Sequence, residues 1–377
     1  MTTLPCAVVA RAQSLSCGSR GARVLSPPST RGFSLVEVVV ALAVGAIVIG
    51  GIYAVANAVH QTVRVFPSSA DVQQRARAAL DALARDARRA GSGGPGIPPL
   101  ASRLAPAVPR RVGLIAPDMP LSAFPDRIAF IATEGDAAAR VVSALPGAVS
   151  TVTIAVASPC PPGDPACGFR ADQDVIVTDN TGRYDVGRLV AVSPPVLQMP
   201  PGTLHYAYSS TDDAWVVPVR TTTYYFDRLR RQLRVYDGYR SDLPLVDDVV
   251  AFSVEWTGDT RAPSRPRPSS GVANCLFDGS GAHRNPAGLL LPPGLVPLDL
   301  AGFRDGPTCG TGPSAFDVDL LRVRALSVRL RVQVADAALR GSDSRFAIAG
   351  LGSTAGTQVA DVEAALDLSP PNLQARE

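Results

Sequence analysis

The sequence predicts an α+β fold, in which a long N-terminal α-helix, transmembrane in its first part, packs on an antiparallel β-sheet domain with long loops. Three patterns in the 377-residue chain predict it. An uncharged apolar run fills 38–59, apolar residues at helical spacing continue it, and alternation of apolar and polar residues dominates the chain after 127. Helices repeat every 3.6 residues and strands every two, so the change of period separates a helical part from a sheet part.

The apolar run at 38–59 predicts a transmembrane helix. Its 22 residues span about 33 Å as a helix, which matches a hydrocarbon core of about 30 Å. Residues 1–32 carry four arginines and no acidic residue, so the positive-inside rule places them in the cytoplasm and the chain after 59 outside the inner membrane. The alternatives are an ordinary signal anchor and a secretory signal peptide cleaved after Ala56 or Ala58, although signal peptides have apolar regions of only about 7–15 residues.

One carboxylate, Glu37, lies near the start of this run. A charged side chain inside the bilayer costs on the order of 2.5–3.5 kcal/mol on insertion scales, so it usually has a partner and a function. We therefore expect Glu37 to need a counter-charge.

The helix is expected to continue outside the membrane through 61–90. Apolar side chains recur there at helical spacing and predict one stripe that faces a core, at Val72, Ala76, Leu80, Leu83, Ala87 and Ala90. Bends are expected at Pro67 and at Gly50–Gly51, and the Gly-rich segment from Gly91 ends the helix.

Three charges crowd one turn near the end of this helix, at Arg85, Asp86 and Arg88. A solvated face, a contact used in assembly, and an intrahelical ion pair of Asp86 with Arg88 or Arg89 all fit this pattern.

After a loop-rich connection at 91–126, the segment 127–341 predicts a β-rich domain. Alternation is cleanest at 250–256 and 326–334, as in antiparallel sheets with one buried face and one wet face. Further strand signals lie at 128–130, 152–156, 174–179 paired with 189–192, and 221–236 as a hairpin.

Two parts of the chain depart from this alternation. Residues 257–315 are rich in Gly, Pro and Ser and predict a long insertion between two strands. The C-terminal tail, 342–377, shows only a weak helical stretch near 359–368, and its last residues are expected to be disordered.

Two of the six cysteines lie within residues 1–32, and four lie in the part of the chain expected outside the membrane, Cys160, Cys167, Cys275 and Cys309. An even number in an exported domain predicts two disulfides. Proximity favours Cys160–Cys167 and Cys275–Cys309, and the two other pairings remain open. The spacings differ from those of zinc ribbons, so we expect no metal site.

The segment around Glu37 resembles the type IV pilin-like proteins, which share a signature of Gly, then Phe or Met, then Glu five residues in. Gly32, Phe33 and Glu37 match it. The resemblance implies that a prepilin peptidase removes a leader, 1–32, and methylates the new N-terminus at Phe33. It also implies a transmembrane helix at 33–60, a pilin-like fold, and assembly in which the Phe33 ammonium of one subunit neutralises Glu37 of its neighbour.

Later segments are similar to the PilW-type minor pilins and to the type II secretion pseudopilin GspJ. These are the blocks at 221–227, 234–238, 244–256 and 323–334, and the segment at the end of the long helix that matches at Leu83, Arg85, Asp86, Arg88, Ala90 and Gly91. The resemblance implies a structural subunit of a type IV pilus that initiates or caps the filament, with other pilins as partners and its globular domain in the periplasm. A GspJ-like pseudopilin and a membrane-anchored adhesion module are the alternatives.

Few residues offer catalytic chemistry. Only His60, His205 and His283 exist, and no common hydrolase, zinc-protease or nucleotide-binding motif accompanies them, so we expect neither an enzyme nor a cofactor. Three aspartates at 172–179 could bind calcium, but a turn beside a strand accounts for them as well. The net charge of +3 is close to neutral, so nucleic acid is not an expected partner.

Overall fold

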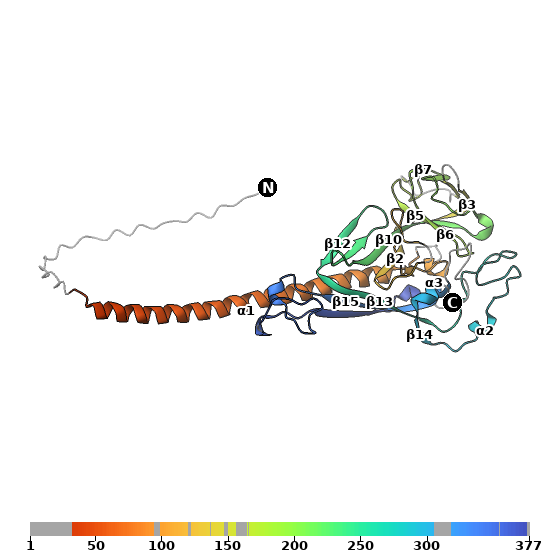
Figure 1. The fold of residues 1–377 in the computed structure, drawn as a ribbon. Helices are drawn as coiled ribbons and strands as arrows, with labels where there is room; N and C mark the ends of the chain where they lie inside the picture. The colour runs from red at the N-terminus through yellow and green to blue at the C-terminus, as the bar shows by residue number, and fades with distance from the viewer. Residues whose placement is uncertain are drawn as a thin grey trace, which may run out of the picture. The chain divides into compact units, whose positions relative to one another are not determined.

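The structure is a computed structural model. It describes residues 32–377 except 94–98, 120–121, 136, 147–149, 156–163, 165, 305–317, 354 and 375–377, and it describes only the backbone of 57–62, 302, 304, 355 and 374. The chain divides into two compact units, Met1–Val59 and His60–Glu377, which are described separately. An N-terminal apolar helix and a large antiparallel β-domain confirm the predicted α+β fold (Figure 1).

Helix α1 (Leu35–Arg89) belongs to both units, and Pro67 lies inside it without ending it. The helix ends where expected, because Gly91 adopts a φ of +70° that favours glycine and donates its N–H to the Ile131 carbonyl at 2.9 Å. The Asn372 side chain donates to the Ala90 carbonyl at 3.0 Å and so satisfies one of the last free acceptors of the helix.

The second part of α1 buries one stripe of mostly small side chains at the predicted spacing. Leu80 of the predicted stripe is only partly buried, whereas Ala79 and Ala84 are buried in addition. Because alanine keeps the helix close to the strands, side chains of α1 share one hydrophobic core with strands of both sheets. The buried members of the stripe are Val72, Ala76, Ala79, Leu83, Ala84, Ala87 and Ala90.

One sheet has four antiparallel strands in the order β14-β13-β15-β16. They are β14 (Leu295–Leu298), β13 (Val249–Asp259), β15 (Val323–Val332) and β16 (Val362–Leu368). The two segments with the cleanest alternation therefore pair directly with each other, β13 against β15.

The other sheet has twelve strands, and its main path runs β1-β2-β10-β3-β4-β8-β7. Its strands are β1 (Ala107–Val108), β2 (Arg127–Thr133), β3 (Ala139–Leu145), β4 (Ser150–Ile154), β5 (Asp174–Thr178), β6 (Tyr184–Arg188), β7 (Ala191–Ser193), β8 (Val196–Met199), β9 (Tyr208–Ser209), β10 (Trp215–Asp227), β11 (Gln232–Tyr236) and β12 (Asp242–Asp247).

Strand β10 takes part in two regions of this sheet. Its second part pairs with β2, with Val219 opposite Thr133, whereas its first residues, from Trp215, pair with β3 and β5. Residues 134–218 are thus inserted between two neighbouring antiparallel strands. They contribute most of a second hydrophobic core, which is separate from the core on α1.

Short helices complete the described chain. They are η1 (Leu100–Ser102), η2 (Ser210–Asp212), α2 (Pro286–Leu289), α3 (Leu300–Arg304), η3 (Val318–Arg322), η4 (Ala337–Leu339), η5 (Ala355–Thr357) and α4 (Pro371–Gln374).

Two secondary-structure predictions are wrong. The stretch near 359–368 is not helical, because β16 pairs with β15 along its whole length. The partner of β5 is β6 and not 189–192, since a turn at Gly182, with a φ of +91°, brings the chain back after only a few residues. The predicted insertion at 257–315 is also not only loop, because the end of β13 and all of β14 lie within it.

Candidate functional site

The first turn of α1 contains the residues of the predicted signature. Gly32, Phe33 and Ser34 precede the helix, and the Ser34 carbonyl accepts from Glu37 N at 2.9 Å and from Val38 N at 3.2 Å. The Ser34 hydroxyl lies 3.3 Å from Val36 N, as in an N-cap. Ser34 and Glu37 have the spacing of a capping box, a local signal that the sequence reasoning missed.

The segment Leu35–Ala56 is apolar and uncovered. Its mean hydropathy is 2.6 over 22 residues, and no part of the described chain buries it. Large side chains on every face of this helix are exposed, for example Leu35 at 81% and Ile47 at 75%. A helix that is apolar all round needs a non-aqueous environment, and this one is long enough to cross a membrane.

Glu37 is the only acidic or basic residue in this apolar segment, and it is exposed. Among the residues that the structure describes, no arginine or histidine forms an ion pair with Glu37. Near the N-terminus of a helix a carboxylate is favoured by the helix dipole, which supports the start of α1.

The charged turn near the end of α1 has two roles. Asp86 faces the sheet and accepts a hydrogen bond from the Tyr224 hydroxyl of β10 at 2.8 Å. Burial and this carboxylate raise the pKa of Tyr224. Arg85 and Arg88 are exposed, which fits both a solvated face and a contact used in assembly. Asp86 binds Tyr224 and forms no ion pair with Arg88 or Arg89, so the intrahelical pair is not formed.

A second polar contact also fixes α1 on the sheets. Arg75 lies between Asp71 on the same helix, at 2.9 Å, and Asp248, at 3.7 Å, in the turn between β12 and β13. Its guanidinium also donates to the Asp247 carbonyl at 3.1 Å. The pair with Asp71 is a local i,i+4 contact, whereas the contacts with Asp247 and Asp248 join residues far apart in the sequence, so no local pattern could have revealed them.

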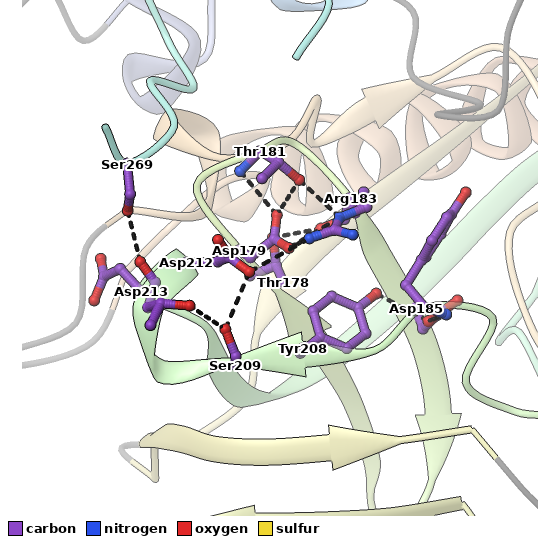
Figure 2. A network of polar contacts seen from close by, with 12 residues as sticks. Thr178, Asp179, Thr181, Arg183, Asp185, Tyr208, Ser209, Asp212, Asp213 and Ser269 are labelled. Carbon is purple, nitrogen blue, oxygen red and sulfur yellow. Dashed lines mark hydrogen bonds and ion pairs between the residues drawn. The ribbon is translucent and has the colours of Figure 1, made fainter. Parts of the chain in front are cut away.

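Figure 2 shows the polar network around β5 and β6. Buried Asp185 accepts from the Tyr208 hydroxyl at 2.9 Å, from His205 N at 2.9 Å and from Tyr206 N at 3.3 Å. Its other oxygen lies 2.8 Å from Nδ1 of His205. Burial first, and then Asp185, raise the pKa of Tyr208. Because these donors all come from 205–208, the histidine and aspartate serve to hold that loop on β6.

Of the three aspartates considered for calcium, Asp172 is exposed and forms no ion pair among the described residues, whereas the other two bind side chains of the domain. Asp174 makes two hydrogen bonds to Arg188, at 2.6 and 2.8 Å, and Asp179 binds Thr181 and Arg183. Within the described ranges, no three His, Cys, Asp or Glu side chains are arranged to hold a metal ion.

Cys167 and Cys275 are both disulfide-bonded. Cys160 and Cys309 lie outside the described residues, as does the leader up to Arg31, so the disulfide pairings stay predictions.

A family model described as the prokaryotic N-terminal methylation motif matches residues 28–53. No curated protein and no solved structure matches the chain. The match includes Gly32, Phe33 and Glu37 and most of the uncovered apolar segment. The chain thus carries a type IV pilin-like signal on a membrane-anchoring helix, which implies processing by a prepilin peptidase and assembly with other pilins as a structural subunit.

Proposed function

We propose that the chain is a minor pilin-like structural subunit that takes part in the assembly of a type IV pilus and initiates or caps the filament. The observation that carries the proposal is an uncovered apolar helix with one carboxylate in its first turn, inside a methylation motif. A soluble protein would leave a large apolar surface in water, whereas a filament core or a bilayer covers it.

In this proposal, cleavage between Gly32 and Phe33 creates an ammonium at Phe33. That ammonium neutralises Glu37 of a neighbouring subunit, which removes the cost of a lone charge in an apolar environment. Apolar side chains of adjacent helices then pack laterally, so leaving the bilayer is coupled to joining the filament. The domain from His60 onward lies in the periplasm before assembly, with Cys160–Cys167 and Cys275–Cys309 as its disulfides.

Mass spectrometry of the mature N-terminus is the first test. A chain that begins with methylated Phe33 supports the proposal. An intact leader, or cleavage after Ala56 or Ala58, contradicts it.

The second test replaces Glu37 with alanine in cells that assemble the filament. The variant should still accumulate in the membrane but should be absent from sheared filaments. Asp367→Ala is the control, because Asp367 is an exposed acidic residue of strand β16, outside helix α1. Normal localisation and activity of Glu37→Ala would favour a tethered adhesion module.

A deletion scored for two phenotypes separates the pilus from type II secretion. Loss of pili with normal secretion supports the minor pilin role. A secretion defect with normal pili would instead identify a GspJ-like pseudopilin.

A further inference from the structure

The outward face of α1 in the second unit is basic. Arg77, Arg85, Arg88 and Arg89 are all exposed there, and Asp81 is the acidic residue among them. The spacing of Arg77, Asp81 and Arg85 by four residues places these three on one side of the helix. We call the four arginines the basic face. With Asp81 included, this surface carries a net charge of +3 (four minus one).

The arginines of the basic face differ from many other arginines of the described chain because they form no ion pair. Strand arginines commonly pair with a carboxylate, as Arg188 does with Asp174 at 2.6 Å and Arg331 with Asp361 at 2.8 Å. On α1, as far as the described residues go, Arg75 alone forms ion pairs. The basic face therefore keeps its charge available for another molecule.

Helix electrostatics explains only half of this arrangement. Arg88 and Arg89 lie in the last turn, where the helix dipole favours positive charge. That effect falls off within one turn, so it does not account for Arg77 or Arg85. An i,i+4 pair with Asp81 is available to both of these, yet the structure forms neither.

We propose that the basic face docks on an acidic surface of a different subunit of the same assembly. This rests on the proposed function. It is favoured by continuity, because the basic face belongs to the same unbroken helix as the segment that carries the assembly signal. Small exposed residues beside it, Ala70 and Ala78, let a partner approach the helix closely.

Charge complementarity argues against a second copy of this chain as the partner. Among the described residues, exposed carboxylates without an ion pair are scattered: Asp172 precedes β5, Asp299 lies between β14 and α3, and Asp367 lies in β16. None of these offers the cluster of acidic groups that four arginines would require. A partner with its own acidic patch supplies the complement and fixes the orientation of docking.

The test uses the full chain in cells that assemble the filament. Arg77→Glu/Arg85→Glu should lower the ratio of filament-bound to membrane-bound protein by at least about tenfold, because like charges across an interface cost several kcal/mol. Arg170→Glu/Arg240→Glu makes the same charge change at exposed sites away from α1 and should leave the ratio unchanged. Arg77→Lys/Arg85→Lys keeps the charge and should incorporate as the wild type does.

A photo-crosslinking amino acid at Ala78 identifies the partner. Adducts to an Asp- and Glu-rich segment of another subunit support the proposal. Adducts to lipid or to a second copy overturn it, as does normal incorporation of Arg77→Glu/Arg85→Glu while the wild type is present in filaments. Absence of the wild type itself from filaments would refute the proposed function, and this inference with it.

Discussion

Replacing Tyr208 with phenylalanine removes a hydrogen bond to a buried carboxylate. Tyr208 is 2% exposed, and its hydroxyl lies 2.9 Å from Asp185, whose side chain is 3% exposed. A hydrogen bond to a charged group contributes about 1.5–3 kcal/mol, and the loss of one oxygen atom leaves little empty space. The free energy of unfolding at pH 7 should fall by about 1.5–3 kcal/mol.

The difference in the free energy of unfolding between the wild type and Tyr208→Phe should become smaller above pH 10. Burial and Asp185 raise the pKa of Tyr208 above its usual 10.0, so near pH 10 the unfolded chain loses this proton while the folded chain keeps it. The stability that comes from the raised pKa is complete below pH 10 and is lost as the pH rises further, at about 1.4 kcal/mol per pH unit. At pH 11 the wild type has lost about 1.4 kcal/mol through this group, and the variant has lost nothing through it.

Unfolding of the full chain in detergent, followed by the fluorescence of Trp215 and Trp256 in denaturant, measures both free energies. The other tyrosines titrate in wild type and variant alike, so their effect cancels in the difference. The gap between the two proteins should narrow by about 1.4 kcal/mol from pH 8 to pH 11. A gap that stays constant over this range would refute the role assigned to burial at Tyr208.

Three further changes test the packing of the domain through the same unfolding midpoint. Gly91→Ala should destabilise by about 1–2 kcal/mol more than Gly135→Ala, because both have positive φ but only at Gly91 would the new Cβ lie 2.8 Å from a proline ring; equal effects would contradict this. Ala79→Leu should cost about 1–3 kcal/mol at a fully buried position, and Ala78→Leu, on the exposed side, close to nothing. Leu368→Ala should cost about 2–5 kcal/mol, and no loss would mean that β16 is not held in the sheet.

Strands with one buried face were predictable because alternation is a local signal. The strand predicted at 326–334 corresponds to β15, which ends at Val332, and its alternate apolar residues from Leu326 on are buried as expected. At the start of β13 the pairing register shifts between Val249 and Ala251, so Val249 is buried and Val250 only partly covered. A shift of register leaves no trace in composition, and the predicted face is therefore wrong at that one position.

The misread strand β16 shows how neighbours override local preference. Glu363, Ala364 and Ala365 favour helix on their own. The open edge of β15 offers the segment a full ladder of backbone hydrogen bonds, and its alternate side chains then pack on the core. The stabilisation from pairing with β15 could not be predicted, because the sequence does not show which strand lies next to this segment.

The candidate site divides in the same way. The signature of Gly32, Phe33 and Glu37 lies within six residues, so it could be recognised from the sequence alone. The hydrogen bond from Tyr224 to Asp86 joins residues 138 positions apart, so only the folded chain reveals that this aspartate faces inward. The exposure of Arg85 beside it could be predicted, but its lack of an ion-pair partner could not.

Strand β10 also determines how tension would pass through the domain. Residues 134–218 leave β2 and return to β10 at adjacent, hydrogen-bonded positions, Thr133 and Val219. A force that pulls on the inserted segment acts on β2 and β10 at the same end and in the same direction. It therefore does not shear the backbone hydrogen bonds between these two strands. The insert can be pulled, or extended until its own core ruptures, while the pairing of β2 with β10 beneath it stays intact.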